Sequence, residues 1–144
     1  MTKTQLLGQI LIERKAVTSE QVKQAVETQR TNKGYIGEML VKLGYANDMD
    51  IIAALVVQCN LPYIAIDKYD IDSDVVRMIP REMASRNWVV PLEKVGDILS
   101  VVMADPLNLS LREELKEVTD CRISPFIASK KEIDRAIERV YNSN

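Results

Sequence analysis

An internal repeat in the first 60 residues constrains the fold most strongly. When the chain is shifted onto itself by about 29 residues, Gly8 falls on Gly37, Leu11 on Leu40, Ala25 on Ala54 and Gln29 on Gln58. Apolar residues also coincide, at Leu7 and Ile36, Ile10 and Met39, Ile12 and Val41, Val22 and Ile51, and Val26 and Leu55. A repeat of this kind indicates one supersecondary unit that is used twice.

Each copy is predicted to form a helix, a turn and a second helix, because its apolar residues recur at helical spacing. Thr18-Ser19-Glu20-Gln21 has the pattern of a capping box, and Asn47 occupies the equivalent position in the second copy. Gly44 is expected to close the third helix, and Gly34 is expected as the C-cap of the second. Leu61-Pro62 should end the helical region, since proline cannot continue a helix.

The pattern changes after Pro62, where short apolar runs alternate with turn residues. Strands are expected at Ile64–Ile66, Trp88–Leu92, Ile98–Met103 and Arg122–Ile127, and helices at Asp74–Met78, Pro80–Ala84, Leu109–Val118 and Ser129–Tyr141. Val95-Gly96-Asp97 supplies a hairpin turn between two of the strands. The predicted class is therefore α+β, with a four-helix subdomain at residues 1–60 and a small α/β subdomain at residues 61–144.

Two residue types are unusual in the repeat. A glycine inside a helix costs about 1 kcal/mol relative to alanine, so Gly8 and Gly37 indicate a close approach to the backbone. Either a neighbouring helix or a ligand can make that approach. Gln29 and Gln58 each end an apolar face, and their amides could bind a nucleobase edge or a phosphate. The alternative for each glutamine is a solvated helix end.

The composition argues against several classes of function. The net charge of -2 offers no basic excess for nucleic acid, which disfavours a helix-turn-helix DNA binder despite the paired helices. The chain has no histidine, which removes Ser-His-Asp and Cys-His catalysis and the usual zinc sites. Its five glycines form no GxxxxGK[ST] phosphate-binding loop. We therefore expect a protein that is not an enzyme and has no cofactor or metal.

No segment resembles a membrane anchor. The longest apolar run, Ile51–Val57, is far shorter than the roughly 20 residues that span a bilayer, and the N-terminus lacks a signal-peptide pattern. Cys59 and Cys121 lie far apart without CxxC spacing, which favours two buried or half-buried thiols. A cytoplasmic location without direct membrane insertion is the expectation.

The repeat also resembles a known family. Leu7-Gly8-x-x-Leu11 leading to Gln29, and Ile36-Gly37 leading to Gln58, are similar to the MshE N-terminal (MshEN) domain of type II secretion and type IV pilus assembly ATPases. The likeness continues through Leu61-Pro62, Ile79-Pro80, Val90-Pro91, Leu99-x-Val101 and Ala104-Asp105-Pro106. It covers nearly the whole chain and implies the same two-part fold. A stand-alone regulator and an N-terminal piece of a larger ATPase are both compatible with it.

The resemblance implies a ligand, because many members of the family bind the bacterial second messenger cyclic di-GMP across the two motifs. The resemblance implies that the residues at the matching motif positions bind this ligand. These residues are Leu6, Leu7, Gly8, Ile10, Leu11, Val22, Val26, Gln29, Tyr35, Ile36, Gly37, Met39, Leu40, Ile51, Leu55, Gln58 and Asp105. Asp105 belongs to the Ala-Asp-Pro segment, which lies near the ligand in the family. Its alternative role is that of a turn residue ahead of Pro106.

The sequence departs from the family pattern at charged positions. Leu6 and Tyr35 stand where the motifs have arginine, and Lys15 replaces a turn glycine that Gly44 keeps. A hydrogen bond to a charged group contributes about 1.5–3 kcal/mol, so one lost arginine would weaken binding roughly ten- to a hundredfold. Stacking of Tyr35 on a guanine could offset part of this.

Two functions follow. The first is a regulatory module that binds cyclic di-GMP, weakly because the arginines are replaced. The alternative is an interaction adaptor of a type II secretion, type IV pilus or motility system that has lost this binding. Leu6 and Tyr35 would then add apolar surface for a partner. The expected partners are thus cyclic di-GMP or a protein of the secretion or pilus machinery, and not nucleic acid.

Overall fold

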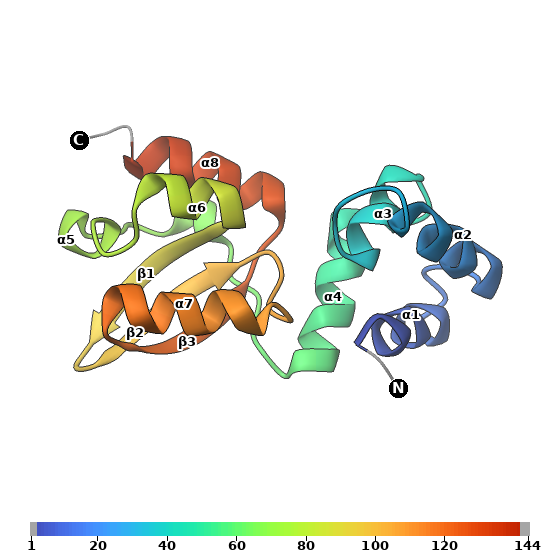
Figure 1. The fold of residues 1–144 in the computed structure, drawn as a ribbon, viewed down its shortest axis with the longest axis horizontal. Helices are drawn as coiled ribbons and strands as arrows, with labels where there is room; N and C mark the ends of the chain where they lie inside the picture. Colours follow the sequence, from blue (N-terminus) through green and yellow to red (C-terminus); the bar gives the residue numbers. More distant parts are fainter. Residues whose placement is uncertain (1–2, 142–144) are drawn as a thin grey trace. The chain divides into compact units, whose positions relative to one another are not determined.

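The computed structural model describes residues 3–141 and divides the chain into two compact units, Met1–Asn60 and Leu61–Asn144 (Figure 1). The first unit is entirely helical in its described part, and the second combines helices with a three-stranded sheet. The predicted α+β class is confirmed. Each unit has its own core and is described separately below.

Four helices form the first unit: α1 (Lys3–Glu13), α2 (Ser19–Gln29), α3 (Ile36–Lys42) and α4 (Asp48–Cys59). The predicted capping box is present at α2, where the Gln21 N–H donates to Thr18 Oγ1 at 3.2 Å and the Thr18 N–H donates to Gln21 Oε1 at 2.9 Å. Asn47 and Asp50 form the same reciprocal pair at α4, at 2.9 and 3.1 Å. Each cap satisfies backbone donors that have no partner inside the helix.

The first helices of the two copies also end alike. Lys15 (φ 62°) and Gly44 (φ 77°) both adopt the left-handed conformation. The next residue donates its N–H back to a leucine carbonyl in each copy, Ala16 to Leu11 at 3.0 Å and Tyr45 to Leu40 at 2.9 Å. The N–H groups of Lys15 and Gly44 donate in turn to the carbonyls of Ile12 and Val41, both at 3.0 Å. The two bonds in each copy form a Schellman motif. Gly44 thus closes α3 as predicted.

Gly34, in contrast, is not the C-cap of α2, and that prediction is wrong. The helix ends at Gln29, and its cap residue Arg30 keeps a right-handed conformation (φ -62°, ψ -32°). The N–H groups of Arg30 and Thr31 donate to Glu27 and Thr28, so the chain leaves the helix through tightened turns. Gly34 (φ 137°) lies further on, immediately before Tyr35 and α3.

The second unit contains the 3-10 helix η1 (Ile66–Lys68), α5 (Ser73–Val76), α6 (Arg81–Asn87), β1 (Val89–Val95), β2 (Ile98–Met103), α7 (Leu109–Thr119), β3 (Arg122–Ile127) and α8 (Lys130–Tyr141). The strand order is β1-β2-β3, with the first pair antiparallel and the second parallel. Gly96 (φ 61°) turns the β1–β2 hairpin. Helix α7 is the crossover that parallel pairing of β2 and β3 requires.

The core of this unit lies between the sheet and its helices. Figure 1 shows the strands between α7 and the pair α6 and α8. Leu115 of α7 and Ile133 of α8 are both fully buried, and so is Val101 of the central strand. The apolar stripe of α8 has helical spacing and faces this core: Ile133, Ala136, Ile137 and Val140.

The predicted strand at Ile64–Ile66 is wrong. Only Tyr63 pairs with the sheet, as an isolated parallel bridge to Ile127, and η1 begins at Ile66. The backbone there bonds locally, from the Lys68 N–H to the Ala65 carbonyl at 3.1 Å. The Arg139 guanidinium also donates to three carbonyl groups of this segment, those of Ile66, Asp67 and Tyr69, at 2.7 to 3.1 Å. Pairing with the sheet therefore stops after the Ile64 N–H, which donates to the Ile127 carbonyl at 3.1 Å.

Trp88 also differs from its predicted place in a strand. It caps the C-terminus of α6 in the left-handed conformation (φ 48°), and β1 begins one residue later. The Lys130 ammonium lies 3.6 Å from the centre of the Trp88 ring, which is a cation–π contact. Trp88 therefore joins the end of α6 to the start of α8.

Candidate functional site

The helices of the repeat pair between copies. Helix α1 packs against α4, and α2 packs against α3, while α1 and α3 also touch. The second helix of each copy thus lies on the first helix of the other, and exchange of the two copies leaves this pairing unchanged. The unit therefore presents each motif position twice, in related surroundings.

Most apolar motif residues form the core of this helical unit. Seven of the predicted ligand-binding residues are at most 4% exposed: Leu7, Leu11, Ile36, Met39, Leu40, Ile51 and Leu55. Their side chains hold the four helices together. The surface that a ligand can reach is therefore made by other motif positions.

The two glycines are explained by helix packing within each copy. A Cβ on Gly8 would lie 3.0 Å from Cγ1 of Val22, and a Cβ on Gly37 would lie 2.7 Å from Cγ2 of Ile51. The distance at Gly37 is shorter than real Cβ atoms show, and the distance at Gly8 is tighter than nine in ten real Cβ contacts. Each glycine therefore makes room for the branched side chain at the start of the next helix.

The remaining apolar motif residues reach the surface. Leu6 is 39% and Val26 is 36% exposed, while Ile10, Val22 and Tyr35 are half-buried. Leu6 and Tyr35 carry no charge, so neither can pair with a phosphate as an arginine would. These five side chains offer van der Waals contact and, at Tyr35, an aromatic ring.

The two glutamines lie in different settings. Gln29 Nε2 donates to the Gly34 carbonyl at 3.1 Å, which ties the end of α2 to the loop before α3. Gln58 is half-buried one residue before the end of α4, and the C-cap of that helix, Asn60, has the left-handed conformation (φ 54°). Both glutamines thus lie near the end of the second helix of their copy, and the Gln29 amide already binds the Gly34 carbonyl.

Asp105 lies in the second unit, in the turn after β2. Its Oδ1 accepts the Leu107 N–H at 3.2 Å, and its carbonyl accepts the Asn108 N–H at the same distance. These bonds fit the turn role that the sequence offered as the alternative. The other sixteen predicted residues all belong to the helical unit.

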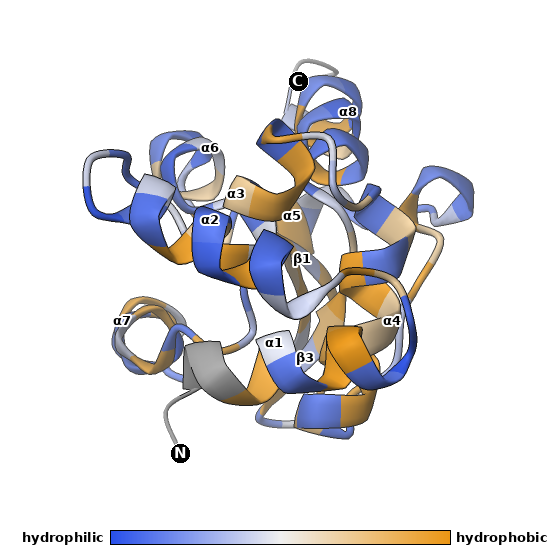
Figure 2. Ribbon diagram, turned by 90° about the vertical axis from the view of Figure 1, so that its right-hand side faces the viewer, coloured by the Kyte–Doolittle hydropathy of each residue, from blue (hydrophilic) through white to orange (hydrophobic). Residues whose placement is uncertain are grey.

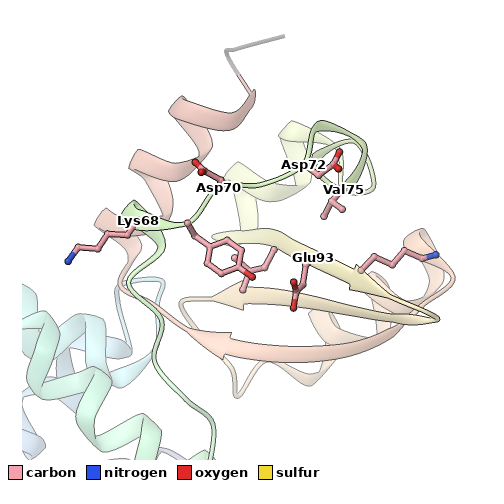
Figure 3. A pocket seen from close by; sticks show the side chains of 8 residues that line it. Lys68, Asp70, Asp72, Val75 and Glu93 are labelled. Atoms are coloured by element: carbon pink, nitrogen blue, oxygen red, sulfur yellow. The ribbon is translucent and has the colours of Figure 1, made fainter.

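The second unit also has a cleft of about 390 Å³ that the sequence analysis missed. Figure 3 shows Asp70 and Asp72 on one wall, Glu93 of β1 on the other, and the Lys68 side chain directed away from these carboxylates. The lining residues are Lys68, Tyr69, Asp70, Asp72, Val75, Leu92, Glu93 and Lys94. They come from two separate stretches, Lys68–Val75 and Leu92–Lys94, which no local sequence pattern links.

Three titratable groups of this unit have pKa values that are shifted away from neutral pH. The hydrogen bond to Glu132 and partial burial raise the pKa of Tyr63 to about 12. Burial, reinforced by Glu93, raises the pKa of Tyr69. A hydrogen bond from Arg135 at 2.7 Å lowers the pKa of Asp67. Each shift favours the charge state that the group already holds at pH 7.

The described residues give no sign of a metal centre or a membrane span. No group of three His, Cys, Asp or Glu side chains in the described part of the chain could hold a metal ion. None of the helices within residues 3–141 is long and apolar enough to cross a bilayer.

Comparison with known proteins identifies the family. The MshEN domain model matches residues 59–144. The type IV pilus assembly ATPase PilB of Myxococcus xanthus is 33% identical over 135 residues, which are 94% of this chain but 24% of PilB. The chain thus spans about a quarter of that relative's length.

Solved structures agree. A structure of MshE with cdg (cyclic di-GMP) matches with a TM-score of 0.81 and 29% identity, covering 94% of this chain and 98% of that one. The N-terminal domain of XpsE shares the fold, with a TM-score of 0.83 and 18% identity over 96% of each chain. The chain belongs to the MshEN domain family.

Proposed function

We propose that the chain is a non-catalytic regulatory module that binds cyclic di-GMP across the two copies of its helical motif. The observation that carries this proposal is the crosswise pairing of α1 with α4 and α2 with α3. Cyclic di-GMP consists of two identical halves, so a surface that repeats each position suits it. The 29% identity with MshE, whose structure holds this ligand, supports the same assignment.

The chemistry follows from the exposed motif positions. Leu6, Ile10, Val22 and Val26 reach the surface and would cover the bases and sugars. Gln29 and Gln58 would supply amide groups to a guanine edge or a phosphate. Because the motif arginines are absent, binding should be weaker than an arginine-bearing motif allows, by roughly ten- to a hundredfold for each lost charged hydrogen bond.

The module would act in the cytoplasm on the machinery to which its relatives belong. PilB is a type IV pilus assembly ATPase, and this chain matches only part of it. We therefore propose a protein of a pilus or secretion machinery as the partner that senses the ligand-bound state.

Isothermal titration calorimetry with cyclic di-GMP tests the binding. We expect measurable heat at high micromolar protein, and a roughly two- to tenfold loss of affinity in Gln29→Ala and in Gln58→Ala, as for a neutral hydrogen bond. Gln24→Ala is the matched control, because Gln24 is an exposed glutamine on α2 outside the predicted site. Folded wild-type protein that gives no heat under these conditions contradicts the proposal.

A second function, the interaction adaptor, is favoured by the outer surface of α4. Met49 and Val57 are 53% and 57% exposed, whereas the equivalent positions of α2 hold Glu20 and Thr28. Figure 2 shows more of the hydrophobic colour along α4 than along α2. Exposed apolar side chains of this kind are typical of protein contacts.

A pull-down from native lysate tests the adaptor. We expect it to recover a protein of a secretion, pilus or motility machinery, and we expect Val57→Lys to abolish the recovery. Thr28→Lys is the matched control at the equivalent position of the first copy. Recovery that Val57→Lys leaves unchanged, or that includes no such machinery, counts against this function.

A further inference from the structure

The two copies differ at the residue that precedes each Leu/Ile-Gly pair. The Cε2 and Cδ2 atoms of Tyr35 lie 2.9 and 3.3 Å from the point that a Cβ on Gly37 would occupy. Around the same point at Gly8, apart from the two chain neighbours of the glycine, Val22 is the only described side chain within 4 Å. Tyr35 therefore rests one edge of its ring on its glycine, and Leu6 does not.

The backbone on both sides of Tyr35 is held in place. Its backbone is extended (φ -86°, ψ 167°) as the N-cap of α3, so the helix fixes the residues that follow. On the other side, Gln29 Nε2 binds the Gly34 carbonyl at 3.1 Å. Gly34 itself lies so close to Glu38 and Met39 that a Cβ there would be 2.9 to 3.0 Å from their side chains. The backbone that carries the ring is thus fixed, and the ring itself packs against Gly37.

We propose that Tyr35, seated on Gly37, is a preformed stacking surface for one purine ring, so that the two halves of a two-fold ligand bind differently. This inference rests on the proposed binding of cyclic di-GMP and deepens it. One guanine stacks on the Tyr35 ring, and the other meets the aliphatic side chain of Leu6, which has no aromatic face. A ring that is already ordered loses little freedom on binding.

Stacking of a base on an aromatic side chain commonly contributes enough to change affinity about fivefold to more than a hundredfold. Such stacking tolerates the loss of the tyrosine hydroxyl but not of the ring. Tyr35 is half-buried, so part of its ring is accessible. The ring therefore supplies binding that does not depend on charge, in a motif that lacks its arginine.

Proton NMR of cyclic di-GMP in the presence of the protein tests this directly, because a stacked aromatic ring shifts the guanine H8 signal upfield. We expect the upfield shift with wild type and with Tyr35→Phe, and its loss in Tyr35→Leu together with a fivefold or larger drop in affinity. Leu6→Tyr should enlarge the shift, because it gives Gly8 the partner that Gly37 has.

Tyr45→Leu is the control for loss of a tyrosine, since Tyr45 is half-buried in the same unit but lies in the turn after α3. Its H8 shift and affinity should match the wild type. If cyclic di-GMP binds but Tyr35→Leu retains both the shift and the affinity, the stacking surface is refuted while the proposed function stands. If wild type and all variants are folded and none binds, the proposed function itself fails.

Discussion

The two copies of the motif share a backbone and differ in side chains. Both begin their second helix with a reciprocal cap, at Thr18 and Asn47, and both end their first helix with a left-handed residue, Lys15 or Gly44. Caps, turns and a few buried positions therefore fix the repeated fold. The remaining positions have diverged, which leaves one copy more polar and the other more apolar at equivalent surface sites.

Truncation of the central leucines is the strongest test of this equivalence. Leu11 and Leu40 are both fully buried, and they occupy the same position of the repeat. We expect Leu11→Ala and Leu40→Ala each to lower the free energy of unfolding by about 2–5 kcal/mol, through lost burial and the cavity left behind. Urea denaturation followed by circular dichroism measures both.

Leu43→Ala is the control for this pair, because Leu43 lies at the end of α3 and is 38% exposed. Leu43→Ala should lower the free energy of unfolding far less than the substitution of either buried leucine. A loss at Leu11 that is several times smaller than the loss at Leu40 would break the comparison, because one copy would then contribute little to the shared core.

The glycines should separate the two copies. In Gly37→Ala the new methyl group meets Ile51 at 2.7 Å and the Tyr35 ring at 2.9 Å. We expect it to destabilise the protein by about 1–3 kcal/mol, as overpacking does. Gly8→Ala should lower the free energy of unfolding by less, because the nearest atom to the new methyl group, Cγ1 of Val22, is at 3.0 Å and alanine gains about 1 kcal/mol in a helix. Thermal and urea unfolding give both values.

A double-mutant cycle identifies the cause. If the clash with Ile51 causes the loss of stability, Gly37→Ala should lower the free energy of unfolding less in an Ile51→Ala background than in the wild type. Equal costs in the two backgrounds would show that the methyl group of Ile51 is not what requires glycine at this position.

Local sequence patterns predicted the parts of the fold that depend on neighbouring residues. The capping box at Thr18–Gln21, the cap at Asn47 and the close of α3 at Gly44 each use bonds within six residues. The run Ile64–Ile66 has the composition of a strand, but Arg139, far along the chain, binds the carbonyls of Ile66 and Asp67. No local pattern carries that information.

The sequence predicted which residues belong to the motif of the candidate site, but it did not predict which of their side chains are exposed. Periodicity shows that Leu40 and Leu6 both belong to apolar positions, yet one is fully buried and the other is 39% exposed. This difference in exposure depends on the crosswise pairing of the helices. The sequence of a repeat does not reveal whether its second helix packs on its own copy or on the other copy. At Gly37 the sequence left a neighbouring helix and a ligand both open, because no pattern places Ile51 and Tyr35 against this glycine.

The smallest expected effect concerns the turns at Lys15 and Gly44. Both residues are left-handed, at φ 62° and 77°, and both close a Schellman motif, but only the second copy has the residue that adopts this conformation without a steric penalty. Lys15→Gly should therefore raise the free energy of unfolding by about 1 kcal/mol, reduced by the loss of a cation near the C-terminus of α1. Gly44→Lys should lower it by a similar amount, so that the double variant returns close to the wild type. Equilibrium urea unfolding of the two single variants and the double variant decides the matter. A Lys15→Gly variant less stable than the wild type would show that the lysine side chain contributes more to this turn than its backbone strain takes away.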